Sequence, residues 1–251
     1  MIVVDDGSRD ATAAEAERAG AMVLAHPSSR GYGAALKTGI LAAKSEFTLI
    51  LDADGQHKAS DVPALLAEAD AHDLVAGHRD RVFHSTPWKL PGKWLLRRVG
   101  SYLVRRPIPD LNCGLRVYRR EPLLRYLRLC SDGYSFSATS LLLMLHEGHR
   151  VTFVPVDVRP AARRGHVTVR TGLDTLVLLL RISTLLDPLR VFLPLSLALF
   201  IAGIAWGMPY ALAGHGVSVG ALLLLVTAML LFGVGLVSDQ IAHLRREWIE
   251  R

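Results

Sequence analysis

This sequence is poor in cysteine, and it lacks the motifs of several protein classes. Its two cysteines in 251 residues, Cys113 and Cys130, make no disulfide framework and no Cys-x-x-Cys metal pattern. It shows no helix-turn-helix, zinc-finger or RNA-binding signature, so we expect no nucleic acid partner. Nothing at its start resembles a signal peptide, because Met1-Ile-Val-Val-Asp-Asp6 predicts a strand entering a turn. We therefore expect the sequence to begin inside a fold.

Charged residues are absent from one long stretch, residues 191–238. This stretch holds two apolar segments, 191–213 and 216–238, separated only by Gly214-His215. At about 1.5 Å per residue, either segment as a helix would cross a hydrocarbon core about 30 Å thick. We predict a transmembrane hairpin here, an amphipathic juxtamembrane helix before it over 171–190, and a tail after it over 239–251.

The arginines flanking the hairpin predict its orientation. They lie before the first segment and after the second, on the side shared by the preceding domain and the tail. By the positive-inside rule, that side faces the cytoplasm. We expect an integral protein of the bacterial inner membrane, with the domain and the C-terminus in the cytoplasm.

The net charge of +6 indicates anionic partners. Much of the positive charge is arginine between residues 79 and 170, which suits nucleotide diphosphates, lipid phosphates or an anionic membrane. Residues 81–109 interleave these cations with Trp88, Trp94 and Tyr102. Two interpretations remain open for this segment: a solvated basic face with packing aromatics, or a segment at a membrane surface.

Strand and helix patterns alternate through residues 1–170. Short apolar runs at 2–4, 21–25, 47–51 and 74–76 predict strands, and helical patterns separate them. Further helices are predicted at 122–129 and 135–147, and a strand at 151–158. The alternation indicates an α/β domain with a mostly parallel sheet. Ligands of such sheets bind beyond the carboxyl ends of the strands.

The third predicted strand, residues 47–51, ends in the turn Asp52-Ala-Asp-Gly-Gln56. Two carboxylates one residue apart at a strand end can converge on one side of it, and Gly55 lets the backbone turn. Closely spaced oxygen ligands suit Mg²⁺ or Mn²⁺ when a substrate phosphate completes the shell. The alternative is an acidic turn with no ligand.

Several motifs in order carry a family resemblance. They are Asp5-Asp-Gly-Ser-Arg-Asp-Ala-Thr12, Arg30-Gly-Tyr-Gly-Ala-Ala35, Asp52-Ala-Asp-Gly-Gln56, Gly77-His-Arg79 and Asp110-Leu-Asn-Cys-Gly-Leu-Arg-Val-Tyr118. Together with the hairpin they resemble family 2 glycosyltransferases with a GT-A fold, and more narrowly the polyprenyl-phosphate, dolichol-phosphate mannosyltransferase-like group. The resemblance implies an inverting hexosyltransferase that moves a sugar from a UDP- or GDP-linked donor to a membrane polyprenyl phosphate (undecaprenyl, decaprenyl or dolichyl). Whether the chain forms a homo-oligomer is left open.

The resemblance also implies roles for individual residues. Those at the donor nucleotide are Asp5, Asp6, Ser8, Arg30, Gly31 and Asp52, with Asp6 at the base and Asp52 near the ribose or sugar. A divalent metal, Mg²⁺ or Mn²⁺, would be held by Asp54 and Gln56. The acceptor phosphate would be bound by Arg79, Arg98 and Arg164. The catalytic residues would be Asp52, Asp54, Asp110 and Arg116.

One departure and three alternatives accompany this interpretation. The family begins with a strand and a Pro-x-Tyr-Asn-Glu-type motif that the sequence lacks, so we expect either an N-terminally truncated chain or a degraded site. A membrane-anchored protein that binds a nucleotide-sugar or lipid phosphate without turnover is the main alternative. A haloacid dehalogenase-type phosphatase is disfavoured because Gln56 stands where that family has Thr or Val. A nicotinamide-binding domain is weaker still, since Leu36 replaces the third glycine after Gly31 and Gly33.

Overall fold

A computed structural model describes residues 1–79, 90–158, 177–178, 180–182 and 184–250. The chain divides into two units, Met1–Thr175 and Leu176–Arg251. Arg164 and the basic loop around it lie outside the described residues, as does part of the predicted juxtamembrane helix over 171–190.

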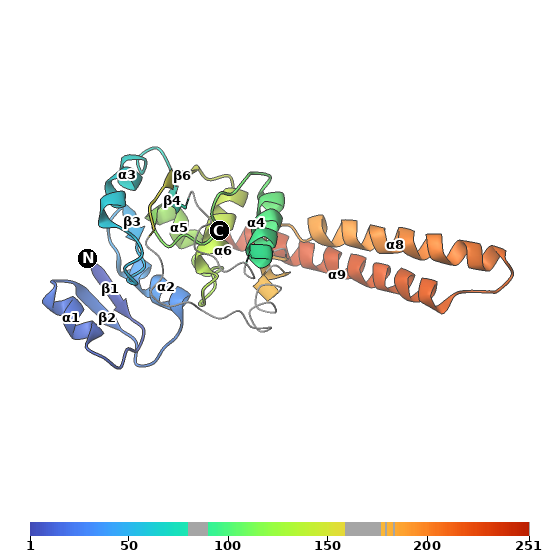
Figure 1. Cartoon of the computed structure of the whole chain (residues 1–251), viewed down its shortest axis with the longest axis horizontal. Helices are drawn as coiled ribbons and strands as arrows, with labels where there is room; N and C mark the ends of the chain where they lie inside the picture. The colour runs from blue at the N-terminus through green and yellow to red at the C-terminus, as the bar shows by residue number, and fades with distance from the viewer. Residues whose placement is uncertain (80–89, 159–176, 179, 183, 251) are drawn as a thin grey trace. The chain divides into compact units, whose positions relative to one another are not determined.

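The first unit begins with a small parallel β-α-β layer (Figure 1). Strand β1, Ile2–Asp5, pairs with β2, Met22–Ala25, in the register Ile2 to Met22. Helix α1, Thr12–Arg18, connects the two strands, as a parallel pair requires a crossover. Among the described strands, β1 pairs with β2 alone.

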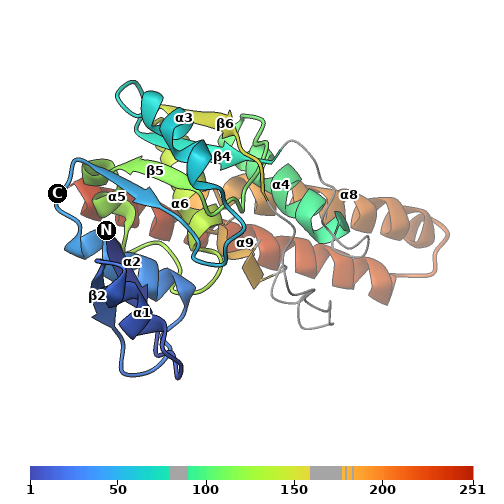
Figure 2. The ribbon, with the colours of Figure 1, turned by 60° about the vertical axis from the view of Figure 1, so that its left-hand side comes forward.

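A second, four-stranded sheet has the order β3-β5-β4-β6. Its strands are β3, Phe47–Ile50; β4, Leu74–His78; β5, Arg116–Arg119; and β6, Val151–Pro155. Strands β4 and β6 are parallel, whereas β5 runs antiparallel to β3 and β4 (Figure 2). Three of the four strands therefore run in one direction, which confirms the predicted mostly parallel α/β architecture. Strand β5 was not predicted.

Helices cover these sheets. They are α2, Tyr32–Ala42; α3, Val62–Ala67, preceded by the 3₁₀ turn η1, Ala59–Asp61; α4, Leu90–Val104; α5, Arg120–Tyr126; and α6, Phe136–His146. Residues 136–145 of α6 are all buried, as expected of a helix that carries apolar and small side chains all around its axis.

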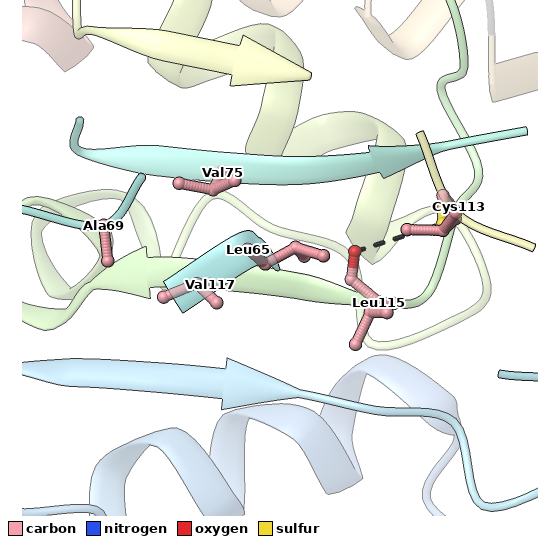
Figure 3. Close-up of a cluster of buried hydrophobic side chains, with 7 residues drawn as sticks. Leu65, Ala69, Val75, Cys113, Leu115 and Val117 are labelled. Carbon is pink, nitrogen blue, oxygen red and sulfur yellow. Dashed lines mark hydrogen bonds between the residues drawn. The ribbon is translucent and has the colours of Figure 1, made fainter. Parts of the chain in front are cut away.

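One face of the larger sheet packs into an apolar cluster against α3 (Figure 3). Val75 and Val117 come from neighbouring strands, and Leu65 from α3 lies between them. Cys113, Leu115 and Val156 belong to the same cluster near the strand ends, and Ala69 is its seventh member. Burying a Leu or Val side chain of this kind contributes about 1.5–3 kcal/mol. The cluster therefore fixes the ends of β4 and β5, where the candidate site lies.

The second unit holds the two long apolar helices α8, Leu189–Leu212, and α9, Val219–Glu250. Within them, segments of 24 and 27 residues are long and apolar enough to cross a membrane. Glycines allow the helices to approach closely, since a Cβ on Gly207 would lie 2.8 Å from the Cβ of Ala221, and one on Gly235 equally near Phe192. The unit is consistent with the predicted hairpin.

Candidate active site

The acidic turn after β3 is exposed and held mainly by its own residues. Gly55 has a φ of 73°, a conformation that glycine adopts without a Cβ clash. The Asp54 carboxylate accepts hydrogen bonds from the backbone N–H of Gln56 (3.0 Å) and from its side-chain amide (2.6 Å). Both groups come from the turn itself, so the carboxylate is shaped locally and open to solvent.

Asp52, at the start of the same turn, is enclosed more tightly. The Tyr32 phenol donates a hydrogen bond to its Oδ1 at 2.7 Å. On the other side it lies against Gly114, where an added Cβ would be 1.8 Å from Oδ2. Asp52 is therefore oriented by a residue of α2 and by the segment that leads into β5.

Tyr32 belongs to a second group of contacts beside the site. Burial raises the pKa of its phenol well above the usual range, so the hydroxyl remains a donor at neutral pH. Its ring stacks on that of Tyr134 at a centroid distance of 5.8 Å. The backbone of Asp132 lies so close to Gly31 that a Cβ there would be 2.6 Å from the carbonyl oxygen. These contacts hold the 31–33 and 131–134 segments together.

Arg79 and Asp110 form a two-point ion pair where β4 ends. Arg79 donates from Nε to Oδ2 (2.6 Å) and from Nη2 to Oδ1 (3.0 Å). Burial alone would raise the pKa of Asp110, but the Arg79 guanidinium and the N–H of Asn112 hold it below the usual range. Asp110 is thus a carboxylate at neutral pH, and it orients Arg79.

His57 shows that the acidic turn and Arg79 lie in one region. Burial lowers the pKa of its imidazole; the charges of Asp52 and Asp54 oppose this shift and that of Arg79 adds to it. Its Nδ1 is buried with no hydrogen-bond partner among the described residues. Residue 57 also forms an isolated antiparallel bridge with Val158. From the sequence alone, His57 is expected to be a surface or helix-end residue, with a small chance of touching the donor because it directly follows the acidic turn.

Arg116 lies in the interior, with 1% of its surface exposed. Its guanidinium donates to the carbonyls of Leu111 (2.8 Å), Cys113 (2.9 Å) and Ser137, and to the Tyr118 hydroxyl (3.2 Å). These bonds fasten the 110–114 segment to α6. The catalytic role predicted for Arg116 stays a prediction, and any such role would act through the segment that the side chain holds.

The predicted nucleotide residues near the N-terminus form a network of their own. The Asp6 carboxylate accepts bonds from the backbone N–H groups of Arg30 and Gly31 and from the Ser29 hydroxyl, and it pairs with His26 at 2.6 Å. Burial would raise the pKa of Asp6, but these hydrogen bonds hold it well below the usual range. Asp6 thus holds the 29–31 loop, and its contact with a base stays a prediction.

The remaining predicted residues are placed as follows. Asp5 is buried and accepts a bond from the N–H of Ser8 at 3.0 Å, which closes the turn after β1. Arg98 lies exposed on α4. Among the described residues no group of three His, Cys, Asp or Glu could hold a metal. Sequence reasoning missed Tyr32 and Gly114, although both stand inside motifs that it used.

Known proteins identify the family. Residues 1–127 match Glycosyl transferase family 2, and residues 187–244 match the GtrB C-terminal hairpin. The fold is that of GT-A proteins: glucosyl-3-phosphoglycerate synthase from Mycobacterium tuberculosis, solved in complex with UDP, superposes with a TM-score of 0.57 at 23% identity, over 72% of this chain and 68% of that one. The chain belongs to Glycosyl transferase family 2.

Similar proteins include enzymes named for lipid-linked sugars. An uncharacterized glycosyltransferase of M. tuberculosis is 40% identical over 134 residues, 49% of this chain and 57% of the relative. The undecaprenyl-phosphate 4-deoxy-4-formamido-L-arabinose transferase of Pseudomonas paraeruginosa is 28% identical over 97% of this chain and 76% of its own length. Glycosyltransferase AglJ of Haloferax volcanii is 26% identical over 100% and 87%. The chain thus spans little more than half the length of the first of these relatives.

Proposed function

We propose that this chain transfers a sugar from a UDP- or GDP-linked donor to a membrane polyprenyl phosphate, giving a lipid-phosphate-linked sugar. The observation that carries the proposal is that Asp52, Asp54 and Arg79 lie near enough to His57 for their charges to act on the pKa of its imidazole. An acidic turn suits a metal-bound diphosphate, and a guanidinium suits a phosphate, so each substrate has a matching group in one place. Family membership and the names of the relatives support the same reaction.

On the donor side, Asp54 and Gln56 would hold the divalent metal, Mg²⁺ or Mn²⁺, and Asp52 the donor ribose or sugar. The residues fit a metal: the Asp54 oxygens are solvent-accessible, and their partners among the described residues belong to the same turn. Such a metal neutralises the charge that develops on a leaving diphosphate. Donor phosphate oxygens would complete its shell. One structure of the M. tuberculosis synthase is described with Mn²⁺ and UDP, which supports this choice.

On the acceptor side, Arg79, Arg98 and Arg164 would bind the lipid phosphate. A phosphate monoester has a second pKa of about 6, so at neutral pH it is largely ionised and needs little help from a general base. The bonds from Arg79 to Asp110 use Nε and Nη2, and neither uses Nη1. Asp110 would then orient the guanidinium so that its Nη1 edge meets the phosphate.

Two groups of predicted residues would act through others. Arg116 would fix the segment that carries Asp110 and Gly114, and so position Asp52 as well. Asp5, Asp6 and Ser8 would shape the turn that holds Arg30 and Gly31 at the nucleotide. These assignments follow from the hydrogen bonds of Arg116, Asp5 and Asp6, which go to other parts of the chain.

The second unit would anchor the chain in the membrane, where the lipid acceptor is found. Its two long apolar helices and the matching hairpin family indicate a membrane protein. We place the first unit and the C-terminus in the cytoplasm, because Arg190 and Arg245 lie at the ends of the helices on that side.

The test uses the full chain in nanodiscs with a short polyprenyl phosphate and Mn²⁺ or Mg²⁺. Transfer of radiolabelled sugar into lipid is measured for a panel of UDP- and GDP-sugars, with Asp54→Ala and the matched surface variant Asp70→Ala. We expect the native chain to transfer sugar from one donor. Asp54→Ala should abolish this transfer, and Asp70→Ala should retain it. Donor binding without transfer under every condition would contradict the proposal and favour a binding protein.

A further inference from the structure

Tyr134 is the most exposed large aromatic residue in the described part of the chain. It stands two residues before α6, and 90% of its surface is exposed. A single exposed aromatic residue is common on protein surfaces and needs no function of its own. Tyr134 differs from such residues because the loop that presents it, residues 131–134, is fastened to α2.

Close backbone contacts fasten this loop. A Cβ on Gly31 would lie 2.6 Å from the carbonyl oxygen of Asp132, and the N–H of Ala34 donates to the same oxygen at 3.0 Å. The carboxylate of Asp132 pairs with Lys37 of α2 at 2.6 Å. The backbone that carries Tyr134 therefore has a defined place against the start of α2.

The ring of Tyr134 lies one ring away from Asp52. It is nearly parallel to the ring of Tyr32, with 13° between the planes and 5.8 Å between the centroids. Such an offset stack is a favourable aromatic arrangement. Tyr32 in turn donates from its hydroxyl to Asp52 at 2.7 Å. Because Tyr134 stays 90% exposed, the stack leaves most of its ring open near the residue proposed to hold the donor.

This position belongs to the sugar end of the donor. In the proposed function Asp52 holds the ribose or sugar, and the base is assigned to Asp6, which bonds to residues 29–31. Arg79, proposed for the acceptor phosphate, pairs with Asp110. A sugar ring has a face of C–H groups, each slightly positive, and this face complements the negative face of an aromatic ring. A phosphate has no such face.

We propose that Tyr134 is a specificity-determining residue that packs its open ring against the sugar of the nucleotide-sugar donor. This inference rests on the proposed function and deepens it, because it names the part of the donor that the ring recognises. Sugars that present a continuous C–H face to Tyr134 bind well, and sugars with a hydroxyl on that face bind less well. The nucleotide and its metal are held by other residues.

The test separates the sugar from the nucleotide. Equilibrium binding to the full chain in nanodiscs with Mn²⁺ is measured for UDP-glucose and GDP-mannose, and for UDP and GDP, which lack the sugar. For the nucleotide-sugar that the native chain binds, Tyr134→Ala should weaken binding about fivefold and leave binding of the matching nucleotide unchanged. Tyr134→Phe keeps the ring and should bind both as the native chain does.

Two further variants identify a purely structural effect. Tyr134→Leu still covers Tyr32 but has no aromatic face, so it should remain as weak as Tyr134→Ala towards the nucleotide-sugar. Tyr210→Ala removes an exposed tyrosine of α8 and should change neither affinity. An equal loss for nucleotide and nucleotide-sugar would overturn the proposal, as would full recovery in Tyr134→Leu.

Binding and transfer are measured on the same preparations, so the two proposals can fail separately. If the native chain transfers sugar and Tyr134→Ala binds the donor as tightly, the role of Tyr134 is wrong and the transfer stands. If Tyr134→Ala loses affinity only for the nucleotide-sugar while the native chain transfers nothing, the contact stands and the transfer is wrong. A native chain that binds neither nucleotide-sugar would overturn both.

Discussion

Two turns of the first unit carry carboxylates directly after a strand, yet they are built differently. Asp6, after β1, accepts hydrogen bonds from Ser29, Arg30 and Gly31, all more than twenty positions away. Asp54, after β3, accepts bonds from Gln56 within its own turn. The first carboxylate joins distant segments, and the second keeps its oxygens at the surface.

The difference teaches that an acidic turn after a strand is structural where a distant loop donates hydrogen bonds to it. It can bind a ligand where its carboxylate oxygens stay exposed. The 29–31 loop offers the backbone N–H groups of Arg30 and Gly31 to the Asp6 carboxylate. The turn of Asp54 faces no such loop among the described residues. The same contrast separates Arg116, whose guanidinium donates mainly to carbonyls, from Arg79, whose side chain is 34% exposed and paired with one carboxylate.

The sharpest test of the comparison is Asp54→Asn, for which we expect the largest effect. Removing a charged ligand that stabilises the leaving group should lower kcat/KM by about 10²–10³-fold. The melting temperature should hardly change, because the lost hydrogen bonds belong to one exposed turn. Kinetics at a fixed Mn²⁺ concentration measure the change in kcat/KM, and thermal unfolding of the same preparation measures the melting temperature. If the melting temperature of Asp54→Asn fell by several degrees, the loss of activity would follow from lost stability, and Asp54 would be a structural residue like Asp6.

Gly114→Ala asks whether Asp52 depends on its packing. The new Cβ would stand 1.8 Å from Oδ2 of Asp52, so the carboxylate must move and its bond with Tyr32 should break. A displacement of about 1 Å can cost about a hundredfold in rate, and we expect a loss of that size in transfer. Gly220→Ala in α9, whose Cβ would meet only Ser218 at 3.7 Å, is the control. Equal activity of both variants would contradict the assigned geometry.

Much of the fold was predictable because its signals are local. Apolar runs and glycine or aspartate boundaries located five of the six strands in the described part of the chain within a few residues. The missed strand, β5, begins and ends with arginine, and sequence patterns assign arginine to surfaces. Arg116 is buried instead because carbonyls of two segments surround it, which no local pattern records.

The site was predictable in its members and not in their partners. The motifs contained Asp52, Arg79 and Asp110: the first two follow predicted strands, and Asp110 begins a motif of the family resemblance. Which groups meet depends on the strand order β3-β5-β4, because it brings Gly114, just before β5, against the end of β3. A sequence pattern holds no information on that order, so the contacts of Asp52 with Tyr32 and Gly114 appeared only in the structure.

Asp6→Asn tests the scaffold half of the comparison through stability. Losing several charge-assisted hydrogen bonds should lower the free energy of unfolding by about 2–3 kcal/mol. Because these bonds lower the pKa of Asp6 in the folded chain, its contribution is full above the unfolded value of about 3.9 and is lost as the pH falls through the folded value. Native and variant stabilities should therefore converge in acid. Thermal melts from neutral to acidic pH measure this, and a constant difference would contradict it.

The smallest effect is expected for Tyr32→Phe, which leaves both turns intact and removes one hydrogen bond. The ring keeps its stacking on Tyr134, while Asp52 loses the phenol donor that orients it. A single hydrogen bond contributes about 1 kcal/mol net, so transfer should fall about fivefold with little change in stability. Kinetics compared with Tyr210→Phe, on α8, measure the effect. A loss of activity as large as that of Gly114→Ala would contradict a purely orienting role for the phenol. It would mean that Tyr32 contacts substrate directly.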